Sequence, residues 1–157
     1  MADLKVKVPA NTQNIEGVVT IRAPLEKVFA AYTDEKLFAQ WWGRGNPLQI
    51  HRFECVTGGG WHLAECAKDG REHEFRGSFH EVALHERIIQ TFEYLGMPER
   101  GHVSLERADF AAIDATTTEI RTLGTAQSRE ERDAMVASGM EAGWRQSVEA
   151  LGKLLEG

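Results

Sequence analysis

The stretch SREERDAMVASGMEAGWRQSVEALGKLL, residues 128–155, carries the strongest structural signal in this chain of 157 residues. Ser128 is followed three positions later by Glu131, which is the capping-box pattern that begins many helices. Behind it, apolar residues recur every three or four positions and therefore share one face of a helix. These residues are Val136, Met140, Trp144, Val148, Leu151 and Leu155. The pattern predicts one helix of about seven turns, whose apolar stripe needs a broad surface to cover it.

The only surface broad enough is a sheet predicted between residues 48 and 123. In this region the hydrophobic period changes to two, and turn residues separate the segments. Connections this short require neighbouring strands to be antiparallel, because parallel pairing needs a long crossover. The expected strands are 48–56, 60–67, 72–82, 87–95, 102–110 and 116–123.

An earlier strand and two short helices precede this region. Residues 16–23 alternate between the two faces and predict a strand. Pro24 suits the first turn of a helix, where its missing N–H has no partner to lose. A second helix begins near Thr33 or Asp34 and ends near Gly43. The apolar residues of the two helices are Leu25, Val28, Phe29, Tyr32, Leu37, Phe38, Trp41 and Trp42.

Length and composition fit one globular domain. The chain is 42% hydrophobic and 27% charged, which is ordinary for a folded protein. We expect a flexible N-terminal segment at residues 1–13 and a single domain at residues 14–157. The expected fold class is α+β: a curved antiparallel sheet of six or seven strands, wrapped around one long C-terminal helix.

Charge and cysteine content exclude several functions. The net charge is −6 and no Lys/Arg-rich run exists, which argues against a nucleic-acid groove or an anionic membrane surface. The N-terminal residues lack a signal peptide's apolar stretch, so the cytoplasm is the expected location. Cys55 and Cys66 should stay reduced there. The histidines show no metal-ligand spacing, and we expect neither a metal nor a cofactor.

The register of one hairpin follows from its residue pattern. A two-residue Asp69-Gly70 turn would mix apolar and polar residues on each face. A three-residue loop with Gly70 in the left-handed conformation pairs Leu63 with Phe75 instead. The inner-face residues are then Trp61, Leu63, Phe75, Phe79, Glu65 and His73.

These residues predict an apolar ligand cavity between the sheet and the long helix. Adjacent Trp41 and Trp42 point roughly 100° apart on a helix, so we expect one to plug the end of the sheet and the other to face the cavity. The alternative is that both belong to the core. Gly139 and Gly143 indicate either space for a ligand or close packing of the helix on a strand. The candidate ligand-binding residues are Trp41, Trp42, Trp61, Leu63, Phe75, Phe79, Phe92, Met135, Gly139, Met140, Gly143 and Trp144.

Several motifs, taken in order along residues 15–156, are similar to one family. They are Ala23-Pro24, TDEKL at 33–37, Trp41-Trp42-Gly43, Gly58-Gly59-Gly60-Trp61, GSFHEV at 77–82, and Gly143-Trp144. The chain resembles the helix-grip fold of the START-like superfamily. Within that superfamily it is similar to the activator of heat-shock protein 90 ATPase-like family, in its short bacterial form. Glu54-Cys55-Val56 departs from the family's Asp-hydrophobic-Arg pattern, so no anion contact is expected from that strand.

The resemblance and the residues leave three functions open. The leading hypothesis is a protein that binds a small, largely apolar molecule without catalysis. The second is a cyclase, dehydratase or hydrolase that uses Glu65 and His73 as acid and base, although both could sit at the solvated hairpin tip. The third is an interaction module for a chaperone or another protein. A homodimer through an exposed strand edge is compatible with the pattern.

Overall fold

A computed structural model describes residues 2–156 of the chain. It contains one antiparallel eight-stranded sheet with the order β1-β2-β8-β7-β6-β5-β4-β3. The strands are β1 (Asp3–Lys7), β2 (Asn14–Ile21), β3 (Leu48–Phe53), β4 (Gly60–Cys66), β5 (Glu72–Ala83), β6 (Arg87–Tyr94), β7 (Val103–Asp114) and β8 (Thr117–Thr125). The helices are α1 (Leu25–Thr33), α2 (Glu35–Phe38), α3 (Arg129–Ala137) and α4 (Met140–Glu156).

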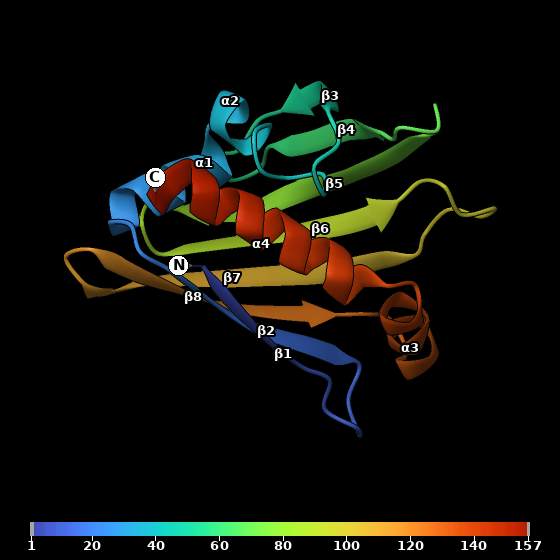
Figure 1. The fold of residues 1–157 in the computed structure, drawn as a ribbon. Coiled ribbons are helices and arrows are strands. Elements are labelled where there is room, and N and C mark those ends of the chain that lie inside the picture. The colour runs from blue at the N-terminus through green and yellow to red at the C-terminus, as the bar shows by residue number, and fades with distance from the viewer. Residues whose placement is uncertain (1, 157) are drawn as a thin grey trace.

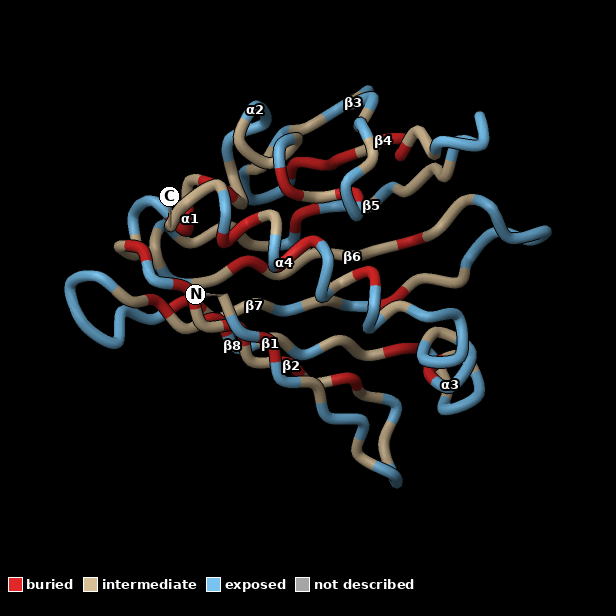
Figure 2. Tube along the Cα trace, viewed as in Figure 1, coloured by how far each residue is buried: buried red, intermediate tan, exposed pale blue. Residues whose placement is uncertain are grey.

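The arrangement confirms the predicted α+β helix-grip fold. Helix α4 lies across one face of the sheet, with α1 near its C-terminal end and α3 near its N-terminal end (Figure 1). We call the sheet face that α4 covers the inner face. Buried residues lie along α4 and in the middle of the strands (Figure 2). The core therefore lies between α4, α1 and the inner face, where Val19, Val28, Leu63, Ile120 and Leu151 are buried.

Part of the N-terminal segment, which we expected to be flexible, forms a strand. Strand β1 occupies part of residues 1–13 and pairs with β2, with Leu4 opposite Val19. Leu4 is buried in the core, and its carbonyl oxygen accepts a hydrogen bond from Arg145 of α4. The alternation of Leu4 and Val6 with charged residues is the period-two signal for this strand. It raises the strand count to eight.

The single C-terminal helix predicted for residues 128–155 is wrong in one respect, because the chain forms two helices there. Ser128 caps α3 as expected, with its hydroxyl accepting from the Glu131 N–H at 3.1 Å. Gly139 then adopts a φ of +85°, which ends α3 and starts α4 in a new direction. Helix α3 turns toward β2, where the buried Arg132 donates to the carbonyl oxygens of Pro9 and Asn14.

The break changes which residues of the predicted stripe reach the sheet. Val148 and Leu151 are buried, and Trp144 is half-buried with its ring over Gly17 of β2. Val136, on α3, is 38% exposed. The apolar stripe therefore contacts the core only along α4.

The predicted hairpin register is confirmed. Leu63 of β4 lies opposite Phe75 of β5, and Glu65 lies opposite His73. Gly70 has a φ of +87°, which is the left-handed conformation expected for the three-residue loop.

Replacing Gly139 by alanine tests the helix break. Alanine in the left-handed conformation should lower the free energy of unfolding by about 1 kcal/mol. Gly139→Asn should cost less, because asparagine tolerates this conformation better. Urea unfolding of both variants measures the difference. A continuous helix would instead be stabilised by alanine, by about 1 kcal/mol.

Candidate functional site

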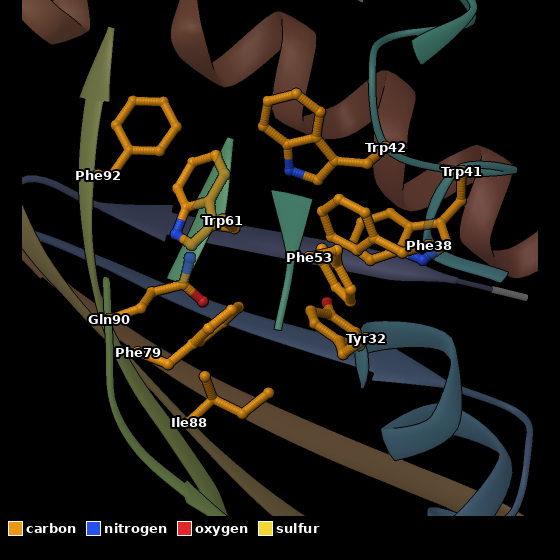
Figure 3. Close-up of a pocket in the computed structure, with 10 residues that line it drawn as sticks. All are labelled: Tyr32, Phe38, Trp41, Trp42, Phe53, Trp61, Phe79, Ile88, Gln90 and Phe92. Atoms are coloured by element: carbon orange, nitrogen blue, oxygen red, sulfur yellow. The ribbon is translucent and has the colours of Figure 1, made fainter. Parts of the chain in front are cut away.

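An aromatic cavity of about 100 Å³ lies between the helices α1 and α2 and strands β3 to β6. Figure 3 shows the side chains of α1, α2 and the following loop on one side of it and those of β6 on the other. Eight of the ten lining residues are aromatic. The other two are Ile88 and Gln90, and the aromatic residues are Tyr32, Phe38, Trp41, Trp42, Phe53, Trp61, Phe79 and Phe92. An apolar cavity of about 150 Å³ accommodates benzene, so this smaller cavity has room for at most a single ring.

The two adjacent tryptophans both line the cavity, but they make different contacts. Trp41 is buried, and its indole N–H donates to the carbonyl oxygen of Ala31 at 2.8 Å, which fixes the ring against α1. Trp42 is half-buried and meets Phe75 edge to face, with ring centroids 5.2 Å apart. Phe38 packs against both indoles. The loop after α2 therefore forms an aromatic cover over strands β4 to β6.

Few polar groups border the cavity. The indole nitrogen of Trp61 is buried and has no hydrogen-bond partner within residues 2–156. Gln90 brings the only carboxamide among the lining side chains. Burial raises the pKa of the Tyr32 hydroxyl, which therefore stays protonated. An apolar wall with a few polar atoms is the usual composition of a small-molecule site.

The candidate acid and base face each other across the hairpin but bind different partners. The carboxylate of Glu65 is 1% exposed and accepts from Arg44 Nε and Nη2, each at 3.1 Å. It also accepts from Asn46 Nδ2 at 2.7 Å. His73 Nδ1 lies 2.9 Å from the Tyr94 hydroxyl. Glu65 is thus deeply buried rather than at a solvated tip, and its hydrogen bonds fix the loop after α2.

The candidate residues on the C-terminal helices lie outside the cavity lining. A Cβ at Gly143 would meet the side chain of Arg44, which shows close packing rather than open space at this glycine. Gly139 serves the helix break, and Trp144 covers Gly17. Met135 and Met140 flank the break and are half-buried.

Of the twelve candidate residues, five line the cavity. They are Trp41, Trp42, Trp61, Phe79 and Phe92. Leu63 is fully buried in the core, and Phe75 packs beside the cavity on Phe92. Sequence reasoning missed the lining residues Tyr32, Phe38, Phe53, Ile88 and Gln90. The helical spacing of Tyr32 and Phe38 with Trp41 and Trp42 was the signal for two of them.

A second polar group that the sequence did not reveal lies on the inner face of β7 and β8. Glu106 shares the face of the buried Phe110 through the two-residue period of β7. Its Oε2 atom, Ser104 Oγ and Thr122 Oγ1 are buried, and none has a hydrogen-bond partner in the described part of the chain. Burial raises the pKa of Glu106 to about 7, and the nearby Ser104 hydroxyl opposes this only in part.

The opposite face of the sheet carries a wider, polar groove. It has a volume of about 560 Å³ and includes His51, His62, Arg76 and Glu93. Several of its side chains form ion pairs, as in Arg76 with Glu93 at 3.5 Å within the groove and His62 with the nearby Glu74 at 3.0 Å. Such a surface favours water over an apolar ligand, so the inner cavity is the better candidate site.

No helix within residues 2–156 has both the length and the apolar content needed to cross a bilayer.

The Glu65 contacts predict a structural role that mutagenesis can separate from catalysis. Glu65→Gln should lower the free energy of unfolding by about 2 kcal/mol, because the amide cannot satisfy both Arg44 and Asn46. Glu74→Gln, which removes a carboxylate from an exposed pair, is the matched control and should change stability little. Chemical denaturation measures both. Equal stability of Glu65→Gln and the wild type would remove the argument for this role.

The raised pKa of Glu106 predicts a pH-dependent stability. An unfolded glutamate titrates near 4.5 and the folded one near 7, so its protonated form favours folding. That contribution is complete below pH 4.5 and is lost as the pH rises through 7. Glu106→Gln should therefore match the wild type at acidic pH and exceed its stability at about pH 8, by an amount on the order of 3 kcal/mol. A stability difference that is constant with pH would contradict this.

Comparisons with known proteins show the family and the fold. The family model described as Activator of Hsp90 ATPase homolog 1-like protein matches residues 22–156. No curated protein matches the sequence.

Solved structures show the same fold at low sequence identity. The protein Ms6760 from Mycobacterium smegmatis is 18% identical, with a TM-score of 0.86 over 96% of this chain and 95% of that one. A protein from Arthrobacter aurescens is also 18% identical, with a TM-score of 0.88 over 97% and 91% of the two chains. One from Rhodobacter sphaeroides is 22% identical, with a TM-score of 0.84 over 97% of each chain. The match of the family model to most of the chain shows that this protein belongs to the Activator of Hsp90 ATPase homolog 1-like family.

Proposed function

We propose that this protein binds a small apolar molecule in the aromatic cavity and does not transform it. The observation that carries the proposal is the cavity itself, a space of about 100 Å³ with eight aromatic side chains and very few polar atoms around it. Binding is favourable when an apolar ligand displaces water from an apolar surface of this kind. As part of the same proposal, we place the protein in the cytoplasm.

The contacts of the candidate acid and base support binding over catalysis. A catalytic group must lie within hydrogen-bond reach of the reacting atom. The Glu65 carboxylate is already occupied by Arg44 and Asn46, and His73 by Tyr94. Neither Glu65 nor His73 is among the residues that line the cavity.

Catalysis is the second candidate. The observation that favours it is Glu106, which lies outside the cavity lining but opposite the lining residue Gln90. A carboxyl group whose pKa is about 7 can both donate and accept a proton at neutral pH. In this alternative, the protein would catalyse a cyclase, dehydratase or hydrolase reaction, with Glu106 rather than Glu65 as the acid or base. A chaperone partner and a homodimer are further proposals that do not depend on the cavity.

The binding proposal can be tested with a substitution that fills the cavity. Native mass spectrometry of the purified protein would reveal small molecules that co-purify. Ethylbenzene is a suitable probe when none does, because it consists of one ring and a short chain. Ligand at one hundred times its Kd adds about 2.7 kcal/mol to the free energy of unfolding, so the melting temperature of the wild type should rise by several degrees.

The matched variants are Ile88→Phe and Ile89→Phe. Ile88 is buried and lines the cavity, whereas Ile89 is its neighbour on β6 and points to the other face of the sheet. We expect Ile88→Phe to abolish the thermal shift and Ile89→Phe to keep it. The proposal fails if ethylbenzene and co-purifying molecules leave the wild type unaffected. Conversion of a co-purified molecule by the wild type, lost in Glu106→Gln, would favour catalysis.

A further inference from the structure

Three buried polar atoms without hydrogen-bond partners gather on the inner face of β7 and β8. They are Ser104 Oγ, Glu106 Oε2 and Thr122 Oγ1, and they make up three of the four such atoms in the described residues. Ser104 is only 4% exposed. Most buried polar groups in proteins are hydrogen-bonded, and exceptions call for a specific cause. We call these three residues the polar patch.

Two glycines let the side chains of the polar patch and of Trp144 pack closely on the backbone of the sheet. Gly124 lies opposite Glu106, and a Cβ at Gly124 would come within 2.6 Å of Glu106 Oε2. Gly17 lies opposite Thr122, and a Cβ there would come within 2.7 Å of Thr122 Oγ1 and would overlap the Trp144 ring. The Glu106 carboxylate therefore occupies the space over Gly124, and the Trp144 ring and the Thr122 hydroxyl occupy the space over Gly17. Trp144 of α4 closes it from above.

The polar patch is a direct neighbour of the cavity. Gln90 lies opposite Glu106 and Phe92 lies opposite Ser104 in the pairing of β6 with β7. Both Gln90 and Phe92 line the cavity (Figure 3). Neighbouring strands are about 4.8 Å apart. The polar patch therefore lies one strand away from the side of the cavity formed by Gln90 and Phe92.

The chemistry of the patch selects the kind of group it can receive. Burial raises the pKa of Glu106 and the Ser104 hydroxyl lowers it only in part, while no cation among the described residues offsets the burial. An ionised carboxylate only accepts hydrogen bonds, and hydroxyl groups accept them as well. A ligand cation would supply both the donors and the missing positive charge, while a ligand anion would be repelled.

We propose that the polar patch holds the cationic end of the cavity ligand, and that the ligand is an aromatic ring carrying an amine on a short chain. This inference rests on the proposed function and names the ligand class for the same site. The ring occupies the cavity between Trp42 and Trp61. The ammonium group donates to Glu106, with Ser104 and Thr122 as further acceptors.

Four probes with one ring test the inference: ethylbenzene, 2-phenylethanol, 2-phenylethylamine and 3-phenylpropionate. Their Kd values are measured by calorimetry at about pH 8, where Glu106 is mainly ionised. A charge-assisted hydrogen bond contributes about 1.5–3 kcal/mol, so 2-phenylethylamine should bind at least roughly tenfold more tightly than ethylbenzene. The alcohol should fall between them, and 3-phenylpropionate should bind most weakly.

Two isosteric variants assign the effect to Glu106. Glu106→Gln should abolish the preference for the amine while leaving the Kd of ethylbenzene unchanged within about twofold, because only the charge is removed. Glu16→Gln makes the same change on the outward-facing side of β2 and should keep the preference. Ser104→Ala should reduce it by a smaller factor.

The outcomes separate the two proposals. Failure of every probe to bind the wild type would overturn the proposed function together with this inference. If ethylbenzene binds but the amine binds no more tightly, the inference alone is overturned. The same holds if the amine preference survives Glu106→Gln, or if 3-phenylpropionate is the tightest ligand. Loss of the preference in Glu106→Gln alone supports the inference.

Discussion

The buried carboxylate of Glu65 joins strand β4 to the loop that covers the cavity, and this loop lies against α4. It extends from β4 and accepts two hydrogen bonds from Arg44, in the loop after α2. Arg44 in turn lies against Gly143 of α4. A buried charge without partners costs several kcal/mol, so the loop, the strand and the helix are held in one arrangement. The same loop carries Trp41 and Trp42, and the cavity therefore depends on this ion pair for its cover.

The two faces of the sheet are built for different surroundings. On the inner face, aromatic rings meet edge to face or tilted, as between Phe38 and Phe53 and between Phe75 and Phe92. On the outer face, charged side chains form pairs across and along the strands, such as Arg87 with Glu81. Because successive residues of a strand point to opposite faces, one sequence can supply both surfaces. The charged outer face is in contact with water. Helix α4 covers only part of the aromatic inner face.

The polar patch shows where this protein departs from the most stable arrangement. Burying Glu106 without a counter-charge opposes folding at neutral pH, which its raised pKa records. Gly17 and Gly124 allow the Trp144 ring and the Glu106 carboxylate to pack on the strand backbone, although glycine weakens a strand. Proteins retain such unfavourable local choices mainly at functional sites. The patch and the cavity are one strand apart, and in our proposal they form the polar and the apolar part of one site.

The sequence by itself determined the α+β architecture, the antiparallel strands and the register that places Leu63 opposite Phe75, because these follow from local periodicity and turn chemistry. Only the tertiary structure decided the break at Gly139, because the periodic stripe continues through it. Before the break, α3 lies where Arg132 contacts Pro9 and Asn14, far away in the chain. The same holds for Glu106, an unremarkable alternating residue of a strand. Its burial depends on strand neighbours and on a helix that local patterns do not encode.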